Sequence, residues 1–183
     1  MTWLIIRGSG IAAFAFLAIS TIWGLLLSGG YAKRLVKAKP LTYAHESLAV
    51  ASIVATVVHL VALWMDSFIQ FGLLELFIPG ASLYRPLAVS LGIVAFYGLL
   101  VVSGSFYVKK RIGQKAWRAI HYTSFGLFLA AAGHGLMAGA DSSIPWVFWM
   151  YVVSTAAVVG LTSMRILGGG ARKARRRPQP AQA

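Results

Sequence analysis

The chain contains four histidines, which lie as two pairs in two apolar stretches. His45 and His59 are fourteen residues apart in the first stretch, and His121 and His134 are thirteen residues apart in the second. Neutral imidazole is the commonest metal ligand among protein side chains. Two helices that each carry two imidazoles at similar depths would clamp two flat, metal-centred rings, one above the other.

Composition places these histidines in a membrane protein. Hydrophobic residues make up 58% of the 183 residues and charged residues only 11%, whereas roughly a quarter of an average soluble domain is charged. No stretch is both long and polar enough to form a separate soluble domain. The absence of cysteine excludes disulfides, thiolate-held iron–sulfur clusters and cysteine-based zinc sites.

Apolar runs long enough to cross a membrane recur along the chain, which predicts an all-α bundle of five transmembrane helices. The connection over residues 66–85 is either an outer loop or a short helix in the membrane interface. We expect one transmembrane domain over residues 1–167 and a disordered basic tail over 168–183. The predicted spans are residues 11–27, with part of residues 2–6 as an alternative extension before them, and residues 41–65, 87–108, 117–138 and 144–167.

The basic residues predict how the bundle is oriented. Four lie in the first loop, five in the third and six from Arg165 onward, while the alternate connections carry few. Because cytoplasmic loops are enriched in Lys and Arg, this pattern places the N-terminus outside and the C-terminus in the cytoplasm. A single Arg7 before the first run also favours a retained helix over a signal peptide. The net charge of +13 comes from basic residues that cluster in short loops and are not spread over a folded surface. We therefore expect no nucleic-acid partner.

This orientation pairs the histidines across two helices. The second and fourth spans both run from inside to outside, and the two histidines of each are separated by roughly 20 Å along the axis. His45 and His121 then share an inner layer, and His59 and His134 share an outer layer. A haem iron takes one imidazole on each face, and two such ligands leave no open position. We therefore predict two b-type haems that transfer electrons.

Haem binding competes with two alternative roles for the histidines. A histidine in an apolar helix is often a structural member of a polar network, although ionisable groups at membrane depth are functional candidates. The second alternative is a polytopic membrane protein that binds or transports metal cations. The lack of cysteine weakens it, as does the scarcity of acids in the spans, where only Glu46 is near a histidine.

The thirteen-residue step in the fourth span does not fit a straight helix. At 100° per residue, fourteen steps return His59 to within about 40° of His45, but thirteen leave His134 about 140° from His121. Either the helix is distorted, with Gly126, Gly133 and Gly135 permitting it, or the two haems lie on different sides of it.

Haem propionates need cations or hydrogen-bond donors. For the inner haem the candidates are Arg118, Lys115, Lys39 and Trp117, and for the outer haem they are Arg85 and Arg7. The competing role for Arg118 and Lys115 is that of topology signals. Arg85 is more informative, because it is the single basic residue of the outer loops beyond the N-terminus.

The pattern resembles the ferric reductase-like transmembrane domain. This family includes NADPH oxidases, ferric-chelate reductases and the haem-binding membrane subunit of the bacterial methionine sulfoxide reductase system. HESLAVASIVATVVHLVALWMDSF is similar to its first histidine helix, and RIGQKAWRAIHYTSFGLFLAAAGHGLMAGADS to its second. The resemblance covers about residues 10–165. It implies two b haems, one on His45 and His121 and one on His59 and His134, that pass electrons across the membrane.

One departure from the family affects the expected electron donor. The oxidases and eukaryotic ferric reductases continue into flavin and NADPH domains, whereas this sequence ends at residue 183. We expect the membrane subunit of an oxidoreductase, similar to the stand-alone bacterial members, with no catalytic acid or base of its own. Its donor would be a flavoprotein, a quinol or a soluble reductase, and its acceptor would be external. The expected location is the lipid of the bacterial inner (plasma) membrane.

Overall fold

The computed structural model describes residues 1–29 and 38–175, and every regular element within those ranges is a helix. This confirms the predicted all-α class. In chain order the helices are α1 (Thr2–Gly29), α2 (Ala38–Trp64), α3 (Leu73–Phe77), α4 (Pro86–Tyr122), α5 (Ser124–Ala138) and α6 (Pro145–Arg175).

Four helical segments are long and apolar enough to cross a membrane, which identifies a multi-pass membrane protein. Large apolar side chains cover much of their outer surfaces; Val54 in α2 and Val153 in α6, for example, are more than half exposed. Such an apolar exterior suits contact with lipid rather than water. The four segments are Thr2–Ser28, Pro40–Trp64, Pro86–Ala138 and Pro145–Leu167.

The long segment Pro86–Ala138 folds back on itself, and it contains both the third and the fourth predicted spans. Gly113 has a φ of 81° and a ψ of 162°, a conformation that glycine adopts without strain and that breaks the helix. The chain after this break runs antiparallel to the chain before it, since His134 contacts Ala88 and Leu127 lies against Gly98. A second interruption falls at Thr123, between the two histidines of the predicted fourth span.

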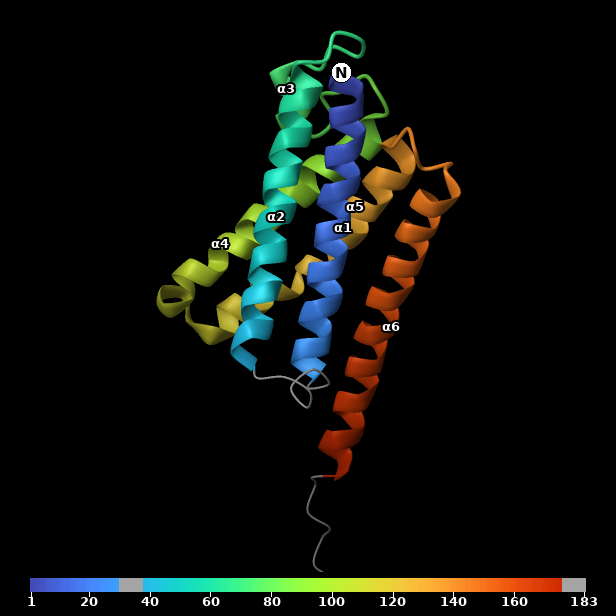
Figure 1. Cartoon of the computed structure of the whole chain (residues 1–183). Helices are drawn as coiled ribbons and strands as arrows, with labels where there is room; N and C mark the ends of the chain where they lie inside the picture. The colour runs from blue at the N-terminus through green and yellow to red at the C-terminus, as the bar shows by residue number, and fades with distance from the viewer. Residues whose placement is uncertain (30–37, 176–183) are drawn as a thin grey trace, which may run out of the picture.

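The helix α1 lies at the centre of the bundle, where it contacts α2, α5 and α6, while α4 packs along α5 and also touches α2 (Figure 1). Aromatic rings fill the junction of α1, α5 and α6. The ring of Phe14 lies 5.5 Å from that of Phe128 and 4.3 Å from that of Tyr151, measured between centroids. All three side chains are buried, so this cluster fixes α5 against α1.

The connection between α2 and α4 contains the short helix that was one of its two predicted forms. In α3 the Glu75 carboxylate accepts a hydrogen bond from the backbone N–H of Gly72, at 2.9 Å, and closes the first turn. Phe71 and Leu76 are buried against Val89 and Ile93 of α4. The connection is therefore packed onto the end of the bundle.

Both ends of the described chain are more helical than predicted. The first helix begins at Thr2, so it includes residues 2–6, the alternative extension of the first span, as well as residues 7–10. At the other end α6 continues to Arg175, past the predicted end of the fifth span at residue 167. The disorder of the basic tail over 168–183 stays a prediction, and residues 176–183 lie outside the described ranges. Once a helix has formed, each further residue that joins it gains one backbone hydrogen bond, so a helix can extend beyond its apolar run. Composition alone does not predict where such an extension ends.

Asp66 joins the start of α1 to the end of α2. Its carboxylate accepts hydrogen bonds from the backbone N–H groups of Phe68 and Ile69 and from the Thr2 hydroxyl, each at 3.1 Å. The hydrogen bond from the Ile69 N–H, together with those from Thr2 and Phe68, holds the pKa of Asp66 below its ordinary value.

Replacing Asp66 by alanine is expected to lower the thermal midpoint of the detergent-solubilised protein at pH 7, because three hydrogen bonds are lost. Since the folded pKa is depressed, the contribution of Asp66 is complete above the ordinary aspartate pKa of about 3.9 and disappears as pH falls through the folded value. The difference in midpoint between the wild type and Asp66→Ala should therefore narrow below about pH 4. A constant difference would contradict this, and exposed Ser67→Ala is the control.

Candidate functional site

The structure brings the four histidines together as two pairs across α2 and the segment after Gly113. The ring centroids of His45 and His121 are 6.2 Å apart, with an angle of 72° between the ring planes. Those of His59 and His134 are 6.4 Å apart, with an angle of 83°. These are the two pairs that the predicted topology formed.

The separations match two imidazoles that share one metal ion. A metal–nitrogen bond to imidazole is about 2.0 Å long and the nitrogen lies about 1.2 Å from its ring centre, so two imidazoles on opposite sides of one metal ion would have centroids about 6.4 Å apart. A direct N–H···N hydrogen bond of about 2.9 Å would bring the centroids to about 5.3 Å. Both pairs are about 1 Å too far apart for that bond. Their spacing therefore leaves room for one metal ion between the two rings of each pair.

Backbone carbonyls determine which nitrogen of three histidines is available. The Nδ1 atoms of His45, His59 and His134 lie 2.8–2.9 Å from the carbonyl oxygens of Ser20, Ile6 and Ala88 respectively. A carbonyl oxygen only accepts, so each Nδ1 carries the proton and each Nε2 has a free lone pair. Metal-bound histidines commonly use their second nitrogen in this way. Within residues 1–29 and 38–175, no protein group is hydrogen-bonded to these Nε2 atoms.

His121 is held differently from the other three. Its ring stacks on Trp117 one turn earlier in the same helix, with centroids 5.2 Å apart and planes 24° apart. The indole Nε1 of Trp117 is buried and has no hydrogen-bond partner among the described residues. The ammonium group of Lys109 lies 3.9 Å from the centre of the same indole. A buried unpaired donor and a cation beside the inner pair are suited to a carboxylate, as haem propionates provide.

The outer pair opens into a cavity of about 220 Å³ inside the bundle. His59 and His134 both line it, together with apolar side chains of α1, α2, α4 and α6. A largely apolar cavity with two convergent imidazoles suits a flat, mostly apolar cofactor. Ser52 also lines the cavity and donates a hydrogen bond to the carbonyl of Ala13, at 2.9 Å, so its hydroxyl is already paired.

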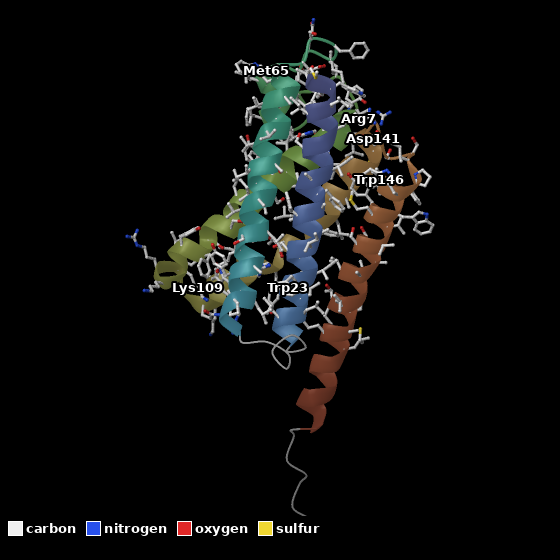
Figure 2. The ribbon with its side chains drawn as sticks, viewed as in Figure 1. Arg7, Trp23, Met65, Lys109, Asp141 and Trp146 are labelled. Atoms are coloured by element: carbon white, nitrogen blue, oxygen red, sulfur yellow. The ribbon has the colours of Figure 1, made fainter. Side chains whose placement is uncertain are left out.

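Arg7 is the basic side chain at this cavity. It forms a bidentate ion pair with Asp141, and both residues line the cavity wall. Figure 2 places Arg7 and Asp141 together at one end of the bundle, at the far end from Trp23 and Lys109. Arg7 thus lies where an outer propionate would need a cation, although Asp141 already neutralises its charge.

The remaining propionate candidates lie elsewhere. Arg85 is exposed, donates to the carbonyl oxygen of Met137, and does not line the cavity. Its φ of 42° belongs to the N-cap of α4 directly before Pro86. Arg118 and Lys115 are exposed near the Gly113 turn. The side chain of Lys39 lies outside the part of the chain whose side chains are described.

The chain matches no protein-family model, no curated protein and no solved structure. The resemblance to the ferric reductase-like transmembrane domain therefore stays a prediction. No group of three or more metal-ligating side chains occurs among the described residues, so the site consists of histidine pairs.

The sequence reasoning missed the part that α1 plays in this site. The carbonyls of Ile6 and Ser20 orient His59 and His45, and the Ser20 hydroxyl also lies 3.0 Å from Nδ1 of His45. The sequence contains one indication of this role, because Ile6 and Ser20 are fourteen residues apart, and so are His45 and His59, which they contact. That match is informative only once α1 and α2 are known to be neighbours.

Proposed function

We propose that this protein transfers electrons across a membrane through two b-type haems. One would be held by His45 and His121 and the other by His59 and His134. The observation that carries the proposal is the spacing of the two ring pairs, 6.2 and 6.4 Å between centroids, with the protons of three rings on Nδ1. When bound, two haems supply one-electron oxidation and reduction.

The residues of the chain would then bind the two haems, orient their histidine ligands and shield them from water. Each histidine pair would hold one haem through both of its imidazoles, which would leave no site for a small ligand such as dioxygen. The carbonyl bonds fix the tautomer and the ring plane of three ligands. Water would be kept from the His59–His134 pair by the buried side chains of Ala88, Val89 and Ile93. The aromatic cluster of Phe14, Phe128 and Tyr151 would close the side facing α6. Asp141, the carboxylate that lines the cavity, is paired with Arg7.

The proposal includes five spans with the N-terminus outside. The turn at Gly113 divides the segment Pro86–Ala138 into two antiparallel halves, which would make the third and fourth spans. Lys109 lies at the same end of the bundle as Trp23, near the end of α1, and Arg165 lies in the last part of α6 (Figures 1 and 2). A basic end of this kind is expected on the cytoplasmic side.

With this orientation the His45–His121 pair would be near the cytoplasm and the His59–His134 pair near the outer face. Electrons would pass between a donor at one face and an acceptor at the other. We also propose that the chain belongs with the ferric reductase-like transmembrane proteins, in a bacterial inner membrane. Four histidines at the family's spacing support this placement.

The direct test is a dithionite-reduced minus oxidised visible spectrum of the purified protein, expressed with a haem supply. We expect b-type α and Soret bands, and about two haems per chain by the pyridine haemochrome assay. The control is the His45→Ala/His59→Ala double variant, which should bind none. Well-folded wild-type protein without b-type bands would refute the proposal.

A further inference from the structure

The helix α1 presents backbone carbonyls to α2 at intervals of seven residues, and each accepts a hydrogen bond from an α2 side chain. The three donors on α2 are also seven residues apart, in the opposite direction. A single antiparallel register of the two helices therefore sets all three bonds, each at 2.9 Å. The pairs are Ile6 with His59, Ala13 with Ser52, and Ser20 with His45.

A glycine lies four residues after every carbonyl that accepts from an imidazole. Gly10 follows Ile6, Gly24 follows Ser20 and, in α4, Gly92 follows Ala88, whose carbonyl accepts from His134. A Cβ on Gly10 would lie 3.1 Å from the ring of His59, and one on Gly24 would lie 3.0 Å from the ring of His45. At Gly92 the distance to His134 would be only 2.7 Å.

Helix geometry explains why the glycine occupies that position. In an α-helix the carbonyl of residue i already accepts the N–H of residue i+4. An imidazole that reaches the second lone pair of that oxygen must pass close to Cα of residue i+4. The smaller hydroxyl of Ser52 needs less room, and the residue four after Ala13 is accordingly Leu17.

The fourth histidine, His121, has no such pair of a carbonyl and a glycine four residues later among the described residues. His121 lies thirteen residues before His134, so the matching position in the antiparallel α4 lies thirteen residues after Gly92. This position is Ser105 and not glycine, and its hydroxyl donates a hydrogen bond to the carbonyl of Val102, at 2.6 Å. The ring of His121 instead stacks on Trp117. The inner pair thus combines one ligand oriented by a neighbouring helix with one oriented by its own.

We infer that Gly10, Gly24 and Gly92 are positioning residues of the haem site. Each one, with the carbonyl four residues earlier, forms a cradle that selects the Nδ1–H tautomer of one histidine and fixes its ring plane. This inference rests on the proposed haem function. It assigns Gly10 and Gly92 to the outer haem and Gly24 to the inner haem, so substitutions should affect the two haems separately.

The experiment replaces each of the three glycines by alanine in the full-length protein. Gly8→Ala in α1 and Gly104→Ala in α4 are matched controls, because a Cβ at either position meets no atom within 4 Å. Alanine is also a better helix former than glycine, so loss of helix propensity does not explain a defect. The measurements are haem content, the reduction potential of each haem, and the low-spin ferric EPR signal, which depends on the angle between the axial imidazole planes.

Gly92→Ala has the closest approach and should leave about one haem per chain, with the reduction potential of the haem that a His59→Ala variant retains. Gly10→Ala should alter the potential and EPR signal of the outer haem only, and Gly24→Ala those of the inner haem only. Unchanged potentials and signals in all three variants, or equal loss of both haems in Gly92→Ala, would overturn the inference. Absence of haem from the wild type would instead refute the proposed function.

Discussion

With two haems bound as proposed, replacing His59 by alanine should lower the haem content from about two per chain to about one. The reason is that the cavity between α2 and α5 would lose one of the two histidines proposed to hold its haem, while the His45–His121 pair is unchanged. His134→Ala should give the same spectrum and the same remaining reduction potential, because His59 and His134 would share one iron. His45→Ala and His121→Ala should form a second class that retains the other haem.

Double variants make this pairing testable. His59→Ala combined with His134→Ala should lose no more haem than either single variant, whereas His59→Ala combined with His121→Ala should lose both haems. Val58→Ala is the matched control, since Val58 is next to His59 in α2 and its side chain is exposed. Haem content is measured by pyridine haemochrome and the potentials by redox titration. If His59→Ala and His134→Ala retain haems of different potential, the pairing is wrong.

Replacing Phe128 by alanine should destabilise the protein by about 3–5 kcal/mol, the range for Phe→Ala in a packed interior. Phe128 is fully buried in α5, and its ring lies 5.5 Å from that of Phe14 in α1. Truncation leaves a cavity at the junction of α1, α5 and α6, which cannot collapse without moving whole helices. Because α1 and α5 both contact the His59–His134 pair, the outer haem should also dissociate more readily.

The free energy of unfolding can be measured by denaturant titration in detergent micelles, followed by circular dichroism. Leu129→Ala is the control for Phe128→Ala, because Leu129 is the next residue of α5 and is 47% exposed. An exposed site of this kind usually changes stability by only about 0.5 kcal/mol. Equal losses in the two variants would show that the aromatic cluster does not stabilise the bundle.

The helical class, the membrane character and the positions of most helices could be predicted from the sequence. Apolar runs are local signals, and a lipid environment allows few structures other than helices to form from them. The pairing of the histidines also followed from sequence, because the alternation of basic loops placed the second and fourth spans in the same direction. A distortion of the fourth span was one of the two alternatives that the thirteen-residue step left open. The helix is interrupted at Thr123, between His121 and His134, and not at one of the glycines that were expected to permit the distortion.

The charged partners of the site show where sequence reasoning stopped. Arg85 was the favoured outer candidate because few cations lie in the outer loops, yet it binds the carbonyl of Met137 and does not line the cavity. Arg7 lines the cavity but is neutralised by Asp141, which lies 134 residues away in the chain. Which cation reaches a buried site depends on contacts between distant segments, and composition does not encode them.

By itself, the sequence determined the class of the protein and its candidate ligands: apolar helices, basic loops that alternate, and four histidines at spacings of fourteen and thirteen. Only the tertiary structure decided how the ligands are oriented. The ring planes of His45 and His59 depend on carbonyls of α1, and that of His134 depends on a carbonyl of α4. The glycines that permit these contacts resemble ordinary packing glycines in the sequence. Their role requires the register between neighbouring helices, which is a long-range property of the fold.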